Sequence, residues 1–204
     1  MTAETPASGR ASTDPRSLAL DEVAHHATSV LLEGRIVHAL LTVDEFERQR
    51  RVVAGLKAVT SLSALHALWE LPGNVRWPEF GLSDTRLDRL QRLGPGLVRF
   101  NDGEAERIYQ PIGRVSSICI TRTRLRDAVL AVGAFPPIFR RVAHAPVFRR
   151  GDEAIVNSAR SLGIGISIGV GSAHVSFAAA GDPLGGRPSV YQWWLAEKAY
   201  AASL

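Results

Sequence analysis

The spacing of apolar residues changes near Gly96, and this change constrains the fold more than any other feature. Before it, apolar residues recur three or four positions apart, which is typical of helices, and we expect helices over 17–41, 42–59, 61–71 and from Ser83 onward. After it, short β-branched runs alternate with helical segments and turn residues, a pattern that predicts strands. We therefore predict an α+β fold, with a helical N-terminal half followed by a mixed β-sheet flanked by helices.

Three segments follow from this division of the 204 residues. Residues 1–16 are rich in Thr, Ala, Ser and Pro and lack large apolar side chains, so we predict a disordered tail. Residues 17–96 form the helical region, and residues 97–204 form an α/β domain with the mixed sheet. The last expected helix carries aromatic side chains that we expect to pack in the core, namely Trp193, Trp194 and Tyr200.

Bulk composition excludes some protein classes. The single cysteine, Cys119, cannot form a disulfide framework within the chain. No apolar run reaches the roughly 18 residues that a membrane span needs. The first residues lack the apolar core of a secretory signal. We therefore expect a cytoplasmic protein without a membrane partner.

Arginine dominates the positive charge of the chain. The formal net charge is +4, and only Lys57 and Lys198 among the 24 basic residues are not arginine. The guanidinium group binds phosphate and carboxylate in bidentate fashion better than an ammonium group does. This composition favours an anionic partner, and the alternative is a genome that prefers arginine codons.

The glycine-rich stretch over 161–181 matches the G-x-S-x-G spacing of a hydrolase nucleophile at Gly165–Gly169. That nucleophile needs a sharp strand-to-helix turn. Ser167 instead lies between Ile166 and Ile168, so we expect it in the middle of a strand that continues into a hairpin. The glycine spacing does not fit a dinucleotide cradle, and the six histidines show no metal-binding spacing. We expect no catalytic residue, no metal and no cofactor.

Residues 43–112 resemble a winged helix-turn-helix module, because two helices precede a third helix and a hairpin with the turn residues Asp102 and Gly103. Such modules place one helix in the major groove of DNA and let the hairpin touch the backbone. The resemblance implies DNA contacts from the third helix, on the side opposite its leucines. The arginines that we expect there are Arg86, Arg89 and Arg92.

A second group of arginines follows an expected strand. Arg122, Arg124 and Arg126 alternate along the chain and could form a rim that binds phosphates. They belong to a longer arginine-rich stretch that also holds Arg114, Arg140, Arg141, Arg149 and Arg150. The alternative is a solvated surface whose charge is balanced by Asp127, Asp152 and Glu153.

From Leu97 onward, the order of expected elements is similar to the restriction-endonuclease-like fold. In that comparison the metal-binding E-x-K positions fall on Cys119, Ile120 and Thr121, so the carboxylate and the lysine are both missing. Glu106 or Asp102 could supply one displaced acid, but one acid does not hold a catalytic Mg²⁺. The resemblance implies a degenerate member that does not cleave.

These patterns predict a non-enzymatic, DNA-associated protein with a regulatory or defence-related role. Two alternatives stay open. One is a protein-interaction module, acting as a homo-oligomer or as a subunit of a larger complex. The other is a metal-dependent nuclease that works through a displaced acid.

Overall fold

The computed structural model describes residues 26–204 except 33, 74, 95, 171–172 and 184–188. Its largest element is a six-stranded mixed sheet, the main sheet, with the strand order β1-β2-β6-β7-β8-β9. The strands are β1 (His26–Leu32), β2 (Arg35–Val43), β6 (Gly113–Thr121), β7 (Arg140–Ala145), β8 (Ile164–Val170) and β9 (Ala173–Ala178).

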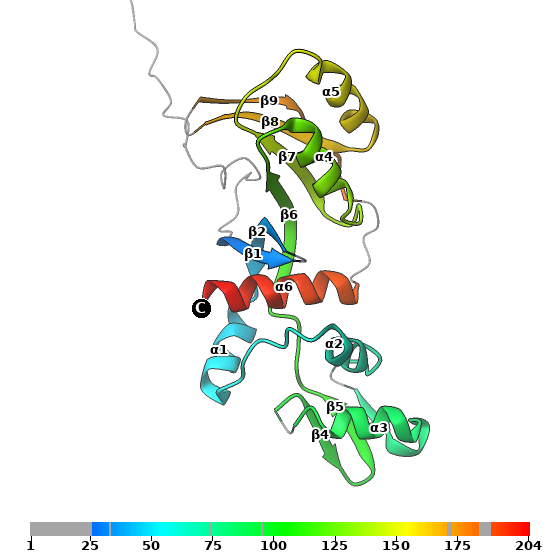
Figure 1. Ribbon diagram of the computed structural model, residues 1–204. Coiled ribbons are helices and arrows are strands. Elements are labelled where there is room, and N and C mark those ends of the chain that lie inside the picture. The colour runs from blue at the N-terminus through cyan, green and yellow to red at the C-terminus, as the bar shows by residue number, and fades with distance from the viewer. Residues whose placement is uncertain (1–25, 33, 74, 95, 171–172, 184–188) are drawn as a thin grey trace, which may run out of the picture.

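The main sheet has a parallel centre and antiparallel strands on both sides of it. β1, β2 and β6 are antiparallel neighbours, whereas β6, β7 and β8 run parallel. The parallel strands are joined by α4 (Leu125–Gly133) and α5 (Asp152–Ser161), as parallel crossovers require. β9 returns antiparallel to β8. The carboxyl ends of β6 and β7 therefore meet at one edge of the sheet (Figure 1).

A second unit is inserted between β2 and β6. After α1 (Glu45–Ala54), the chain forms the helix–hairpin unit, which we define as residues 61–110. It contains α2 (Leu62–Trp69), β3 (Arg76–Pro78), the 3₁₀ turn η2 (Glu79–Gly81), α3 (Asp84–Gln91), β4 (Val98–Asn101) and β5 (Glu104–Arg107). Its three strands pair antiparallel in the order β3-β5-β4. The turn between β4 and β5 has positive φ at both Asp102 (52°) and Gly103 (76°), as a two-residue hairpin turn requires.

The last helix, α6 (Val190–Ser203), lies between the main sheet and the helix–hairpin unit (Figure 1). Leu195 and Tyr200 pack in the core of the main sheet, whereas Trp193 packs in the core of the helix–hairpin unit. Trp194 is partly buried against both cores. A helix that is apolar on several sides is buried on several sides, which is the position that α6 occupies.

The prediction of a helical N-terminal half is wrong. Residues 26–43, most of them within the helix predicted over 17–41, form β1 and β2 of the main sheet. Val30, Val37 and Ala39 are buried whereas Ser29, Leu31 and Ile36 are exposed, which is the period of two of a strand with one covered face. The fold is α+β, with helices interspersed among the strands of the described residues.

The tail predicted over 1–16 and the first part of the helix predicted over 17–41 lie outside the described residues. The boundary after residue 96, between a helical region and an α/β domain, stays a prediction. The main sheet takes strands from both sides of that residue, because β1 and β2 precede it and the other four strands follow it.

The strand assignment of Ser167 is confirmed. β8 runs without a break from Ile164 to Val170 and pairs with β9 as a hairpin. Ser167 therefore does not lie at a strand-to-helix corner. Gly163 has a positive φ of 64° directly after α5, where glycine is favoured because it carries no Cβ.

Candidate functional site

Positive charge is unevenly distributed along the chain. Residues 111–150, which run from just before β6 to the loop after β7, contain eight arginines and one carboxylate, Asp127. The helix–hairpin unit contains six arginines and seven carboxylates. A polyanion would therefore meet a favourable potential at the main sheet rather than at the helix–hairpin unit.

The carboxyl ends of β6 and β7 lie side by side. Thr121 pairs with His144 across the two strands, and the Arg122 backbone N–H donates to the His144 carbonyl (3.0 Å). The segments that leave these strand ends lead into α4 and α5. Together with the first turn of α4, they carry five arginines, which we call the carboxyl-edge arginines: Arg122, Arg124, Arg126, Arg149 and Arg150. In open α/β sheets, ligands bind outside the carboxyl ends of the strands.

Four of the carboxyl-edge arginines are exposed: Arg124, Arg126, Arg149 and Arg150. Within the described residues, no carboxylate lies within ion-pair distance of their guanidinium groups. Arg122 is half-buried, and its Nη1 donates to the carbonyl of Thr121 (2.8 Å).

The nearby acids interact with the backbone. Asp152 accepts from the Arg149 backbone N–H (2.8 Å), and Glu153 accepts from the Gly151 N–H (3.1 Å). Both carboxylates thus stabilise the start of α5. Within the described residues, the charge of the four exposed arginines is not neutralised by these carboxylates.

The arginines of the predicted recognition helix, α3, differ from the four exposed carboxyl-edge arginines because two of the three form ion pairs with carboxylates. Arg86 pairs with Glu70 (3.1 Å) and its side chain is 23% exposed, while Arg92 pairs with Asp88 (2.7 Å). Arg89 is exposed and pairs with no described carboxylate. The DNA contact from these three residues stays a prediction.

The two acids considered for a displaced nuclease site lie in the smaller sheet. Glu106 is on β5 and pairs with Arg99 (3.4 Å), and Asp102 is in the β4–β5 turn. Cys119, on β6, is buried, and burial raises the pKa of its thiol to about 12. Burial therefore favours the thiol over the thiolate, which is the nucleophilic form. In the part of the chain that the structure describes, no three His, Cys, Asp or Glu side chains gather as a metal site would need.

A polar pair that the sequence analysis did not anticipate joins β7 and β8. His144 Nδ1 lies 3.3 Å from Ser167 Oγ, and the two residues are directly opposite in the parallel register. Their exposed fractions are 6% and 2%, so no substrate reaches them. The pair is a hydrogen bond within the sheet.

We predict that Ser167→Ala leaves nucleic-acid binding unchanged, because Ser167 is buried in mid-strand. The loss of one buried hydrogen bond should lower the free energy of unfolding by about 1 kcal/mol. Urea unfolding and fluorescence anisotropy with labelled duplex DNA measure both effects. A variant that folds but has lost binding would contradict the structural role of this serine.

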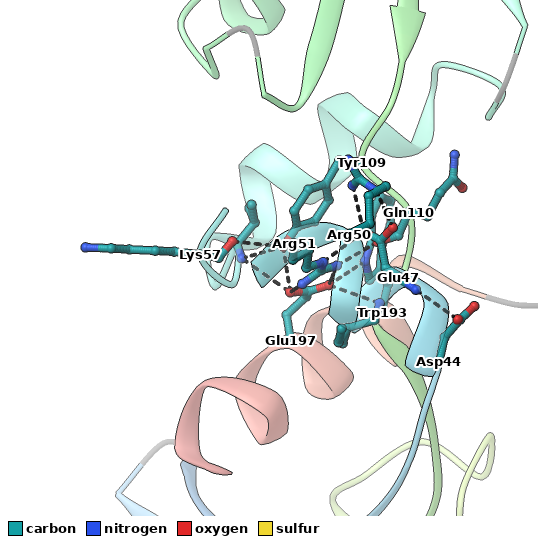
Figure 2. Close-up of polar contacts among 11 residues, drawn as sticks. Asp44, Glu47, Arg50, Arg51, Lys57, Tyr109, Gln110, Trp193 and Glu197 are labelled. Carbon is teal, nitrogen blue, oxygen red and sulfur yellow. Dashed lines mark hydrogen bonds and ion pairs between the residues drawn. The ribbon is translucent and has the colours of Figure 1, made fainter. Parts of the chain in front are cut away.

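A polar network lies where α1, α6 and the segment before β6 meet (Figure 2). Arg51 of α1 donates to both oxygens of Glu197 of α6 (2.8 Å each), to Glu47 (2.8 Å) and to the carbonyl of Gln110 (2.6 Å). The side chains of Arg51 and Glu197 have no exposed surface. A buried ion pair of this kind requires hydrogen bonds for all its polar atoms.

Glu197 receives further hydrogen bonds. The Tyr109 hydroxyl donates to Oε2 (2.8 Å) and the Trp193 indole N–H donates to Oε1 (3.0 Å), as Figure 2 shows. Burial and the charge of Glu197 raise the pKa of Tyr109, so its hydroxyl remains a donor. Although burial alone would lower the pKa of Arg51, hydrogen bonding and the charge of Glu197 raise it. The network holds α1, α6 and the segment before β6 together, and it is closed to solvent.

None of the helices in the described ranges combines the length and the apolar character that crossing a bilayer demands. Searches against protein-family models, curated proteins and solved structures find no match to this chain.

Proposed function

We propose that the protein is a non-enzymatic, DNA-associated protein, with a regulatory or defence-related role, and that it contacts nucleic acid through the carboxyl-edge arginines. The observation that carries this proposal is that four exposed arginines without a described ion-pair partner follow the carboxyl ends of two adjacent strands in the chain, before or within the first turn of the next helix. Each guanidinium group that neutralises a phosphate releases condensed counterions, which drives binding. A cytoplasmic location is part of the same proposal.

The part of the proposal that says the protein does not cleave nucleic acid rests on the sequence of β6. Cys119, Ile120 and Thr121 occupy the positions at which a nuclease-like strand would carry its carboxylate and lysine. The order of β6, α4 and β7 supports a degenerate nuclease-like relation. The order of α2, β3, α3 and the β4–β5 hairpin supports a winged-helix-like relation for the helix–hairpin unit.

Binding of the wild-type protein to a random duplex at several salt concentrations tests the proposal. Four phosphate contacts predict that log K falls against log salt with a slope of about −3 to −4. Fluorescence anisotropy between about 50 and 200 mM KCl measures this slope. No binding at the lowest salt concentration, or binding that salt does not weaken, would overturn the proposal.

A protein-interaction role is the second candidate function. Phe46 and Val53, seven residues apart on α1, are 80% and 89% exposed, and residues at this spacing share one helix face. An apolar stripe of this kind is typical of a surface that a partner covers. Sedimentation analysis of the wild type and of Phe46→Ser tests self-association through this face: an oligomer that becomes a monomer in the variant would favour this candidate.

A further inference from the structure

A cleft of about 180 Å³ opens beside α6, between the helix–hairpin unit and the start of β6. It is lined by Trp69 of α2, Gln192 and Trp193 of α6, Ser189 just before α6, and Gly113 and Arg114 of β6. Trp69 is 37% exposed and Arg114 is also exposed, so the cleft opens to solvent on their side. It lies at the start of β6, whereas the carboxyl-edge arginines follow the end of that strand.

Two indole rings form the apolar wall of this cleft. The ring centroids of Trp69 and Trp193 lie 6.1 Å apart, with the ring planes tilted by 55°. Trp193 is fixed in place, because its N–H is bound by Glu197 (3.0 Å) and the guanidinium of Arg107 lies over its ring (5.3 Å). A cavity of about 150 Å³ admits a benzene molecule, so this cleft has room for one aromatic ring.

The polar groups that line the cleft favour a negatively charged substituent on a bound aromatic ring. Ser189 Oγ accepts from the Gln192 N–H (3.1 Å), and the Gln192 side chain bonds the Ser189 N–H (3.2 Å) and the Ile138 carbonyl (3.1 Å). These groups are therefore held in place by hydrogen bonds to the protein. Arg114 is the only charged residue among the described lining residues, and no described carboxylate pairs with it.

We propose that this cleft binds a small aromatic carboxylate, with its ring against Trp69 and Trp193 and its carboxylate on Arg114. A guanidinium group and a carboxylate form paired, charge-assisted hydrogen bonds, which are stronger than bonds to a neutral acceptor. The ligand touches α2, α6 and β6 at once. The proposal does not depend on nucleic-acid binding, since neither Trp69 nor Arg114 belongs to the carboxyl-edge arginines.

Calorimetric titration of the full chain with benzoate, and with benzamide as its neutral analogue, tests this inference. We expect saturable binding of benzoate, at least about tenfold tighter than that of benzamide. Arg114→Gln should weaken benzoate about tenfold and leave benzamide unchanged. Arg99→Gln, which changes an exposed arginine of β4 that does not line the cleft, is the matched control and should leave both affinities unchanged.

Trp69→Ala reports on the position of the ring and should weaken both compounds. Circular dichroism checks that each variant is folded. Several results would overturn the inference: no saturable heat with benzoate up to about 10 mM, equal affinity for the two compounds, or benzoate binding that Arg114→Gln or Trp69→Ala leaves intact.

Discussion

Simultaneous replacement of Arg124, Arg126, Arg149 and Arg150 by alanine should weaken nucleic-acid binding by at least about 100-fold at low salt. All four side chains are exposed, and within the described residues none is held by a carboxylate. Each lost phosphate contact removes about 0.9 from the salt slope, so the residual slope should approach zero. Anisotropy titration of the variant beside the wild type measures both quantities.

Stability should be nearly unaffected in this variant, because exposed side chains without partners contribute little to folding. The matched control replaces four arginines whose side chains are also solvent-accessible but are ion-paired, namely Arg48, Arg76, Arg99 and Arg140, which pair with Glu45, Glu104, Glu106 and Asp182. This control should retain the wild-type slope. Equal loss of binding in both variants would indicate that net charge alone, and not the carboxyl edge, determines affinity.

The predicted DNA contact from α3 can be compared with the proposed contact from the carboxyl-edge arginines. If Arg86→Ala, Arg89→Ala and Arg92→Ala together abolish binding while the carboxyl-edge variant binds normally, the contact is made by the predicted recognition helix. The proposal for the carboxyl edge would then be wrong, although DNA association would stand. If the wild type binds no nucleic acid, the protein-interaction candidate takes precedence.

Features that depend on a few adjacent residues could be predicted from the sequence. Asp102–Gly103 marks the β4–β5 turn, and the β-branched neighbours of Ser167 place it within β8. These features are decided by backbone preferences over a few residues, which a single sequence contains. The assignment of Trp193 and Tyr200 to the core also agrees with their exposed fractions of 2% and 5%.

The failed prediction over 26–43 has an identifiable cause. In a short, largely apolar segment, buried positions fit a spacing of two as well as a spacing of three or four, so periodicity does not separate strand from helix. Gly34, with a φ of 73° between β1 and β2, was the signal that a hairpin interrupts the segment. The pairing of β2 with β6, in which the partners lie 70 to 81 residues apart (Val43 with Gly113, His38 with Cys119), has no local signal.

The Arg51–Glu197 pair could not be predicted either, because its partners are 146 residues apart in the sequence. One member of the pair, Glu197, does have a signal in the sequence. Glu197 is the only carboxylate in α6, among mostly apolar residues. A lone carboxylate on a helix that is buried on several sides requires a cationic partner inside the protein.

Glu197→Ala should lower the free energy of unfolding by about 3–5 kcal/mol, which is a large part of the stability of an ordinary domain. The change leaves the buried Arg51 guanidinium with Glu47, the Gln110 carbonyl and the Tyr109 ring as partners. It removes the acceptor of the Trp193 indole and the carboxylate acceptor of the Tyr109 hydroxyl, which keeps only the Lys57 carbonyl (3.2 Å). Urea unfolding followed by tryptophan fluorescence measures the loss. Glu104→Ala is the control, because its 3.8 Å contact with Arg76 is solvent-exposed and should contribute less than about 1 kcal/mol.

A double variant separates the two ways in which this pair could act. Replacing both members by apolar residues of similar size, Arg51→Met with Glu197→Leu, removes the uncompensated charge as well as the ion pair. It should restore much of the stability that Glu197→Ala loses, because a buried ion pair is often no more stable than a well-packed apolar contact. If the double variant is as unstable as the single one, the hydrogen bonds from Tyr109, Trp193 and the backbone N–H of Val59 to Glu197 carry the stability of this junction rather than the charge pair. A loss below about 1 kcal/mol in Glu197→Ala itself would show that α1 and α6 are held together by their apolar contacts alone.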